Sequence, residues 1–301
     1  MNSKNNLCYL WLLLAAVFWG GSFVFTKYLL ASLDPVSIIF IRLIISSLFL
    51  WLISLLFLRK RLKIDQKDWK FVFLFSFFEP FLYFIFETYS LIYTSASIVS
   101  IIIATIPLFT ALLSKYYFTE NFSNLNLAGV LISVTGIGIM LLPGFMDTPD
   151  GLWGVALALL AVFSAVGYGF YVKKLSKNYH PVVIVTYQNS IGAIFFLPLF
   201  LILGHFNDTS IWIAMTDPAN LANLLILAIF CSSLAFIFFL RGIQVLGLGR
   251  ANVFSNLIPV ATAVISFFLL GEEFPLYKII GMAVVIVGIF LVQKKTITVN
   301  S

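Results

Sequence analysis

The sequence predicts an all-α integral membrane protein whose ten transmembrane helices form two inverted five-helix repeats. First, 61% of the 301 residues are hydrophobic and only 10% are charged, whereas a soluble domain is about half apolar and about one quarter charged. Second, apolar runs of about 20 residues, the length that a helix needs to cross a bilayer, follow one another along the chain. Third, a set of residues recurs in the second half of the chain, which is typical of secondary transporters.

The recurring positions define the two copies. Five residues of the first half recur 152 positions later in the second half. They are Pro107, Glu120, Phe122, Gly129 and Gly136, which recur as Pro259, Glu272, Phe274, Gly281 and Gly288. A shift of 146 residues places Lys27 and Pro35 over Lys173 and Pro181. We therefore expect one repeat in residues 1–146 and a second repeat in residues 147–301.

The first copy contains five apolar runs. We expect its membrane spans at residues 9–30, 35–58, 70–92, 95–118 and 124–142. Between the third and fourth spans, only Tyr93, Thr94 and Ser95 suggest a turn. The repeat supports a division there, because the fourth span then corresponds to the ninth.

The second copy repeats this order. Its spans are expected at residues 151–174, 181–203, 220–241, 248–270 and 275–293. The apolar run after Lys4 continues to about Leu30 without a small-residue cleavage site, so we interpret it as a retained first span rather than a signal peptide.

The placement of Lys and Arg predicts the orientation. If the N-terminus is cytoplasmic, all of the 18 Lys and Arg residues fall on the cytoplasmic side except Lys27, Arg42 and Lys278. Short cytoplasmic loops retain positive charge during insertion, so both termini are expected in the cytoplasm. Because each copy has an odd number of spans, the second copy must enter the membrane from the opposite face.

Several function classes are excluded by the residues present. The basic residues lie between apolar runs, where they orient a membrane protein, so we expect no nucleic-acid partner. We expect the protein to be surrounded by the lipid bilayer. Cys8 and Cys231 suggest neither a disulfide framework nor a metal site. The chain has no phosphate-binding Gly-Lys-Ser/Thr loop, so we expect no ATP and no cofactor. His180 and His205, its two histidines, lie far apart in the sequence, which disfavours a membrane enzyme such as a lipid-modifying transferase.

The opening of the chain resembles a known family. The similarity is carried by Phe18 to Phe23, Lys27, Asp34, Pro35 and Arg42, and by the repeated endings of the two copies. These residues resemble the EamA family of the drug/metabolite transporter superfamily. The resemblance implies a ten-helix inverted-repeat fold that exports amino acids or related metabolites from the bacterial cytoplasm, and therefore a location in the inner membrane. The second copy departs from the first, with Ala165 in place of Trp19 and Gln188 in place of Arg42.

Ionisable residues within spans are functional candidates, because a charge in lipid costs several kcal/mol. Lys27, Arg42, Glu79 and Glu87 are the candidates here. Glu79 lies mid-span beside Pro80, where a kink can open a polar pocket, so we interpret it as a cavity residue that contacts the solute. A carboxyl group in an apolar setting can release and regain a proton, so we interpret Glu79 also as the coupling residue. For Arg42 and Glu87, together with Lys27, a static ion pair that holds helices in register is the alternative.

Aromatic and amide side chains are candidates for solute contact. Trp19, Tyr83, Tyr168 and Tyr171 are expected near mid-membrane, and of these we select Trp19 and Tyr83 as cavity residues. Asn252 and Asn256 either contact solute or connect helices. Pro107 and Pro259 are expected to break corresponding helices, and we interpret them, with Pro80, as gating bends.

The predicted function is that of a secondary transporter working by alternating access on a small-molecule metabolite. A carrier or flippase of lipophilic drugs or lipid-linked solutes remains an alternative. The sequence leaves open the solute, the direction of flow, the coupling ion, and whether the protein is a monomer or a homodimer.

Overall fold

The structure is a computed structural model that describes residues 3–107, 109–110, 124–141, 151–204, 209–273 and 275–293. Every regular element within these ranges is helical. The predicted repeat positions Glu120, Phe122 and Phe274 lie outside the described residues, as does His205.

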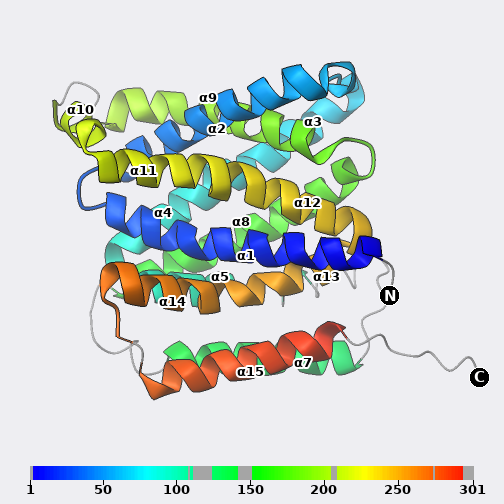
Figure 1. The fold of residues 1–301 in the computed structure, drawn as a ribbon, viewed down its shortest axis with the longest axis vertical. Helices are drawn as coiled ribbons and strands as arrows, with labels where there is room; N and C mark the ends of the chain where they lie inside the picture. Colours follow the sequence, from blue (N-terminus) through cyan, green and yellow to red (C-terminus); the bar gives the residue numbers. More distant parts are fainter. Residues whose placement is uncertain are drawn as a thin grey trace, which may run out of the picture.

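The first half of the chain supplies helices that lie roughly parallel to one another (Figure 1). In chain order these are α1 (Ser3–Leu29), α2 (Pro35–Phe57), η1 (Arg59–Arg61), η2 (Gln66–Asp68), α3 (Trp69–Ser76), η3 (Phe77–Leu82), α4 (Tyr83–Tyr93), α5 (Ala96–Ile103) and α7 (Asn124–Leu141). The predicted division between the third and fourth spans is confirmed. Thr94 is extended, and Ser95 caps α5 by accepting a hydrogen bond from the backbone N–H of Ile98 at 3.2 Å.

The second half continues the bundle. Its helices are α8 (Gly151–Ser176), α9 (Pro181–Leu203), α10 (Thr209–Thr216), α11 (Pro218–Ile226), η4 (Leu227–Leu234), α12 (Ala235–Leu246), α13 (Leu248–Asn252), η5 (Val253–Leu257), α14 (Ile258–Leu270) and α15 (Leu276–Gln293). The short helix α10 was not predicted. Gly247 and Gly271 follow α12 and α14 with φ of 86° and 66°, a backbone conformation that favours glycine at such ends.

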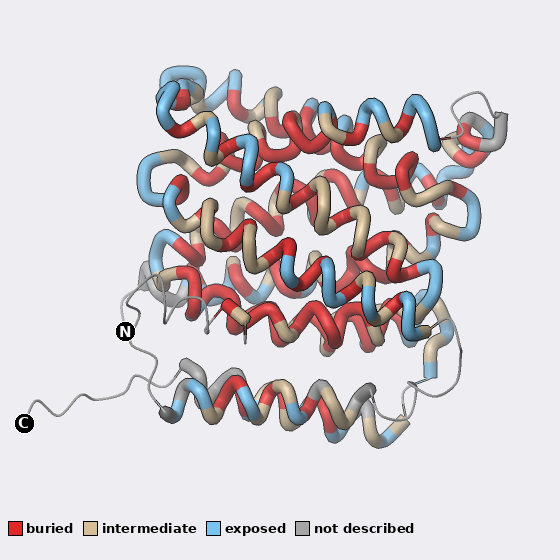
Figure 2. Tube along the Cα trace, turned by 180° about the vertical axis from the view of Figure 1, so that it is seen from behind, coloured by how far each residue is buried: buried red, intermediate tan, exposed pale blue. Residues whose placement is uncertain are grey.

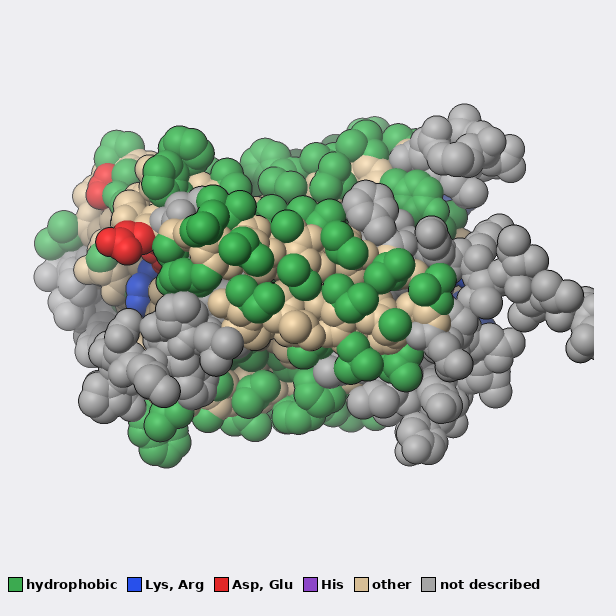
Figure 3. Space-filling view, turned by 90° about the horizontal axis from the view of Figure 1, so that it is seen from below, with side chains coloured by type: hydrophobic (Ala, Val, Ile, Leu, Met, Phe, Trp, Pro, Cys, Tyr) green, Lys and Arg blue, Asp and Glu red, His purple; other side chains and the backbone are tan. Residues whose placement is uncertain are grey.

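The helices have the length and surface of membrane spans. Among the described residues, seven helical segments are long and apolar enough to cross a bilayer, and two shorter apolar helices lie within α7 and α15. Viewed from the side of α7 and α15, hydrophobic side chains cover most of the described surface, whereas charged side chains lie near its ends (Figure 3). The chain is therefore a multi-pass membrane protein.

Two pairs of corresponding helices pack against each other across the two halves. α2 packs along α9, and α7 packs along α15. In the second pair a Cβ atom added to Gly136 would lie 2.7 Å from the backbone oxygen of Gly281, so the two helices approach as closely as their backbones allow. The repeated glycines thus allow close packing of the two helices.

The remaining helices form the core between these pairs. α1 packs against α12 and α14, and α8 packs against α4 and α5. Buried residues concentrate where neighbouring helices face one another in the middle of the bundle (Figure 2).

The connections between consecutive membrane spans alternate between the two ends of the bundle (Figure 1). We call the end that contains residues 58–68 and 177–180 the basic end, and the end that contains residues 30–34 and 94–95 the opposite end.

Four helices are interrupted. The predicted third and eighth spans each contain a π-helical segment, η3 and η4, so their interruptions lie at corresponding places in the two halves. At η3 the backbone of Glu79 leaves the helical region with φ −147° and ψ 114°, next to Pro80, which has no N–H to donate. A turn at residues 104–105 and the 3₁₀ helix η5 interrupt the other two just before Pro107 and Pro259.

Candidate solute-binding site

A small cavity lies where helices from the two halves meet. Its volume is about 40 Å³. Trp19 of α1, Glu79 of η3, Tyr83 of α4 and Asn252 of α13 line it, so the structure brings together four side chains that were predicted to contact solute. A cavity of this size holds about one water molecule, so it must enlarge before a metabolite can enter.

Aromatic rings form one wall of this cavity. Trp19 packs edge-to-face against Phe236 and Phe239 of α12, with ring centroids 5.2 and 5.0 Å apart. Tyr168 also lines the cavity, although only Trp19 and Tyr83 were predicted to do so among the four aromatic residues expected near mid-membrane. Its hydroxyl donates to Oε1 of Gln188 at 3.4 Å. These rings give the site fixed apolar surfaces of the kind on which aliphatic or aromatic groups pack.

The two predicted asparagines differ in their surroundings. Nδ2 of Asn252 donates to Oγ1 of Thr110 at 3.0 Å, which connects α13 to the described part of the fourth span. Asn256 is buried in η5 but is not among the residues that line the cavity. Within the described part of the chain, its Oδ1 has no hydrogen-bond partner. Asn252 thus connects helices and also lines the cavity, and its contact with a solute stays a prediction.

Glu79 reaches the cavity because the helix is broken at its position. A regular helix would continue through η3, but Pro80 removes a backbone donor and the chain widens there. Only 7% of the Glu79 side chain is exposed. It interacts electrostatically with Glu87 and Arg42, so three ionisable groups share one region of the membrane-embedded core.

Arg42 and Glu87 are even more deeply buried, with 1% and 2% of their side chains exposed. Nε of Arg42 donates to Oγ of Ser232 at 2.9 Å, and the guanidinium carbon lies 4.1 Å from the centroid of the Phe84 ring. Glu87 accepts a hydrogen bond from Oγ1 of Thr88 at 3.0 Å. The charges of Arg42 and Glu87 interact, but no ion pair joins them among the described residues.

Lys27 lies apart from this group. Its Nζ donates to the backbone oxygens of Leu91 and, at 3.1 Å, Thr94, at the C-terminal end of α4. It lines a separate chamber at the opposite end of the bundle. The structure therefore divides the predicted set of charges into a central group and a peripheral lysine.

The predicted gating prolines occupy the helix interruptions. Pro80 is buried against Gly192 of α9, where an added Cβ would collide with the proline ring. Pro107 is buried just after the turn at residues 104–105, and Pro259 stands in the first turn of α14. Their positions are compatible with bending, and their role in gating stays a prediction.

Comparison with known proteins places this architecture in a family. The family model described as "EamA-like transporter family" matches residues 6–142 and again residues 152–293. The chain belongs to the EamA-like transporter family. The resemblance seen in the sequence is thereby confirmed, and the protein is a transporter.

Individual relatives of this EamA protein are also transporters by name. An uncharacterized transporter of Archaeoglobus fulgidus is 28% identical over 298 residues, covering 98% of this chain and 99% of that protein. The uncharacterized transporter YetK of Bacillus subtilis is 30% identical over 225 residues, covering 73% of this chain and 67% of its own. A probable terminal-alkyne amino-acid exporter of Streptantibioticus cattleyicolor is 25% identical, covering 68% of this chain and 67% of its own.

A solved crystal structure shares the fold. It superposes with a TM-score of 0.76, covers 96% of both chains and is 15% identical to this EamA protein. Because this identity is low, the comparison supports the helical architecture alone.

A buried polar network around Arg42 was not predicted. Nδ2 of Asn189 in α9 donates to Oγ of Ser46 at 2.6 Å and to the backbone oxygen of Ser232 at 2.8 Å. Oγ of Ser46 is also 2.6 Å from Oγ of Ser233. Ser232 and Ser233 are adjacent in an apolar span, and this pattern could have indicated the network, because hydroxyl groups in lipid require partners. In this EamA protein the network connects α2, α9 and η4.

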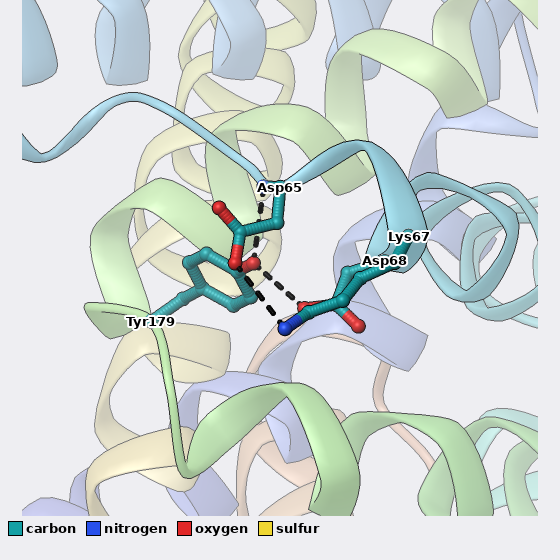
Figure 4. A network of polar contacts seen from close by, with 4 residues as sticks. All are labelled: Asp65, Lys67, Asp68 and Tyr179. Carbon is teal, nitrogen blue, oxygen red and sulfur yellow. Dashed lines mark hydrogen bonds and ion pairs between the residues drawn. The ribbon is translucent and has the colours of Figure 1, made fainter.

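A second network connects loops at the basic end (Figure 4). The hydroxyl of Tyr179 donates to Oδ2 of Asp68 at 2.7 Å and accepts from the backbone N–H of Asp65 at 3.1 Å, while Lys67 lies 3.7 Å from Asp65. Beside it, Nη2 of Arg241 is 2.8 Å from Nε2 of His180. Burial and the nearby Arg241 and Arg61 lower the pKa of His180 below its ordinary value.

Proposed function

We propose that this EamA-family protein exports amino acids or related small metabolites across the inner membrane by alternating access. The observation that carries the proposal is the central cavity, where Trp19, Tyr83, Glu79 and Asn252 converge at the junction of the two halves. It offers aromatic surfaces, an amide and a carboxyl group, which suit a small solute with both polar and apolar parts. The name of the Streptantibioticus relative, a probable amino-acid exporter, supports this substrate class.

The transport mechanism rests on ten spans arranged as two inverted repeats, residues 1–146 and 147–301. The packing supports this arrangement, because exchanging the halves converts the contacts of α1 with α12 and α14 into those of α8 with α4 and α5. The cavity supports it as well. Equivalent positions line it in pairs, namely Trp19 with Ala165, Ile103 with Ser255, and Ile106 with Ile258. A solute held between such copies becomes accessible from either side as one copy rocks against the other.

In this proposal the basic end faces the cytoplasm, together with the N- and C-termini. The connections there carry Arg59, Lys60, Arg61, Lys63 and Lys67 in the first half and Lys177 in the second. The retention of positive loops in the cytoplasm supports the assignment. The bilayer surrounds the apolar sides of the bundle, and a homodimer stays a prediction.

Glu79 is the proposed coupling residue. It lines the cavity, its backbone breaks the helix, and its carboxyl group shares the core with Arg42 and Glu87. Each solute would then exchange against a proton that Glu79 binds on one side of the membrane and releases on the other. Glu87 lies two turns further along the same span but does not line the cavity, which makes it the matched control.

The test is flux of labelled amino acids and metabolites in proteoliposomes, with and without an imposed pH gradient. We expect saturable flux of one solute class, gradient dependence that is lost in Glu79→Gln, and gradient dependence that persists in Glu87→Gln. Wild-type pH dependence in Glu79→Gln would refute the coupling role. Movement of a fluorescent lipid or drug, without flux of any water-soluble solute, would replace the proposed function with the lipophile-carrier alternative.

A further inference from the structure

Arg42 is a buried cation whose hydrogen bonds are incomplete. An arginine side chain carries five N–H donors, and only 1% of this one is exposed. Its Nε donates to Oγ of Ser232, and its guanidinium group lies over the ring of Phe84. Its Nη1 is buried and has no hydrogen-bond partner among the residues that the structure describes. Because an unsatisfied buried donor is more costly when it is charged, this position favours the binding of an anionic group.

Two carboxyl groups lie in the same region without satisfying Nη1. Glu79 and Glu87 interact electrostatically with Arg42, but neither forms an ion pair with it within the described ranges. Glu87 instead accepts a hydrogen bond from Oγ1 of Thr88 on its own helix. The bond to Ser232 holds the guanidinium group in an orientation that leaves Nη1 without either acid. Arg42 is therefore placed to receive an anionic group from outside the protein.

The guanidinium group lies one side chain behind the wall of the central cavity. Tyr83 lines the cavity, and its ring centroid is 5.8 Å from that of Phe84. The guanidinium carbon of Arg42 is in turn 4.1 Å from the Phe84 centroid. A displacement of these two rings would bring Nη1 into contact with a solute in the cavity.

The two π-helical segments both approach Arg42. Ser232, its hydrogen-bond partner, belongs to η4, and Glu79, which interacts with its charge, belongs to η3. Such segments are frequent at functional sites, and helices bend at them. Because α2 packs against η4, bending there changes the position of Arg42 relative to the cavity. The same movement that enlarges the cavity can therefore uncover Nη1.

We propose that Arg42 binds the carboxylate of the solute when the central cavity enlarges. A guanidinium group forms short, strong hydrogen bonds with a carboxylate, and Nη1 alone carries two N–H donors. Glu79, at the cavity wall, would then face the ammonium group of an amino acid. This inference rests on the proposed function and narrows its solutes to those that carry a carboxylate. It gives Arg42 a role in solute recognition instead of the static ion pair that was the alternative.

The test compares an amino acid with its carboxamide, which has nearly the same shape but lacks the negative charge. Each is applied as a competitor of labelled amino-acid flux in proteoliposomes. We expect the wild type to prefer the acid by about tenfold or more, as one charged hydrogen bond contributes. Arg42→Gln should lose this preference. Arg42→Lys should keep part of it, because lysine retains the charge but not the planar set of donors.

Arg250→Gln is the matched control, because Arg250 is exposed and is not among the residues that line the cavity. It should keep the full preference for the acid. Gln188 occupies the position of the second copy that corresponds to Arg42, and it is fully buried. A glutamine is thus accommodated at the corresponding position, so Arg42→Gln is expected to fold, and thermal melting in detergent verifies this.

Three outcomes would contradict the inference. An unchanged preference in folded Arg42→Gln would overturn it. A full wild-type preference in Arg42→Lys would do so even if Arg42→Gln is unstable, because lysine cannot reproduce the planar contact. Equal competition by the acid and its carboxamide in the wild type would overturn it while leaving transport intact. Absence of flux for every water-soluble solute would instead overturn the proposed function together with it.

Discussion

Nε of Arg42 in α2 donates a 2.9 Å hydrogen bond to Oγ of Ser232 in η4, and this bond joins the two halves in the buried core. The partners are 190 positions apart in sequence. Arg42 is also held over the face of Phe84, so a hydroxyl and an aromatic ring both contact its guanidinium group, and within the described ranges no carboxylate forms an ion pair with it.

Removal of the Ser232 hydroxyl should therefore destabilise the protein. In Ser232→Ala, Nε of Arg42 loses its acceptor, and an unsatisfied buried donor costs about 1–3 kcal/mol. We expect a lower melting temperature in detergent micelles. Thr216→Ala is the control, because among the described residues its exposed hydroxyl bonds only within its own helix, to the backbone oxygen of Ile213. Equal melting of the two variants would show that the interhelical bond contributes nothing measurable.

The contact between α7 and α15 should not tolerate an added methyl group. In Gly136→Ala the Cβ would lie 2.7 Å from the backbone oxygen of Gly281 and 2.8 Å from the backbone nitrogen of Val285, so the helices must separate. Such overpacking costs about 1–3 kcal/mol. Gly138→Ala on the same helix meets nothing within 4 Å and should melt like the wild type or slightly above it. Thermal melting of both variants tests this, and equal melting temperatures would contradict the predicted overpacking.

Acidification should weaken the fold through His180. Its pKa is lowered from the ordinary 6.5, first by burial and then by Arg241 and Arg61, so the unfolded chain binds the proton more readily. Stability from this residue is full above pH 6.5 and declines as the pH falls through the lower folded pKa. His180→Gln can still accept from Arg241 but does not titrate. Its stability should fall less than that of the wild type between about pH 7.5 and 5. If the free energy of unfolding falls equally with pH in the wild type and in His180→Gln, this role of His180 is contradicted.

The Tyr179 hydroxyl should stabilise the loops at the basic end. Tyr179→Phe leaves the ring but removes the partner of both Asp68 and the Asp65 backbone N–H. Because Asp68 is buried, we expect a loss of about 1–3 kcal/mol, together with faster proteolysis in residues 58–68. Unchanged cleavage in these residues would mean that other contacts hold the loop.

Much of the helical layout could be predicted from the sequence. Apolar runs and charged or proline punctuation placed most helix boundaries close to those observed, including the division at Thr94 and Ser95. Trp19, Tyr83, Glu79 and Asn252 were each selected as candidates, because unusual polar and aromatic residues in lipid require a cavity or a partner. That all four line one cavity is known from the structure, and their contact with a solute stays a prediction.

Other features of the site could not be predicted. Tyr168 was not selected, although it lines the cavity, because a helix that is apolar on all sides does not reveal which face is inward. Lys27 was grouped with Arg42 and Glu87, although it lies in the chamber at the opposite end, because depth along a span does not specify the neighbouring helix. The acceptor of Arg42 was missed for the same reason.

The sequence by itself determined that this chain is a membrane protein, where most of its long helices begin and end, and which family it resembles. These properties depend on local hydrophobicity, helix punctuation and short motifs, which act over neighbouring residues. Only the tertiary structure decided which side chains share a cavity, that Ser232 accepts a hydrogen bond from Arg42, and that Lys27 faces a separate chamber. These relationships join residues from different halves of the chain. They depend on how the helices rotate and pack against one another, and this packing is determined by many side-chain contacts at once.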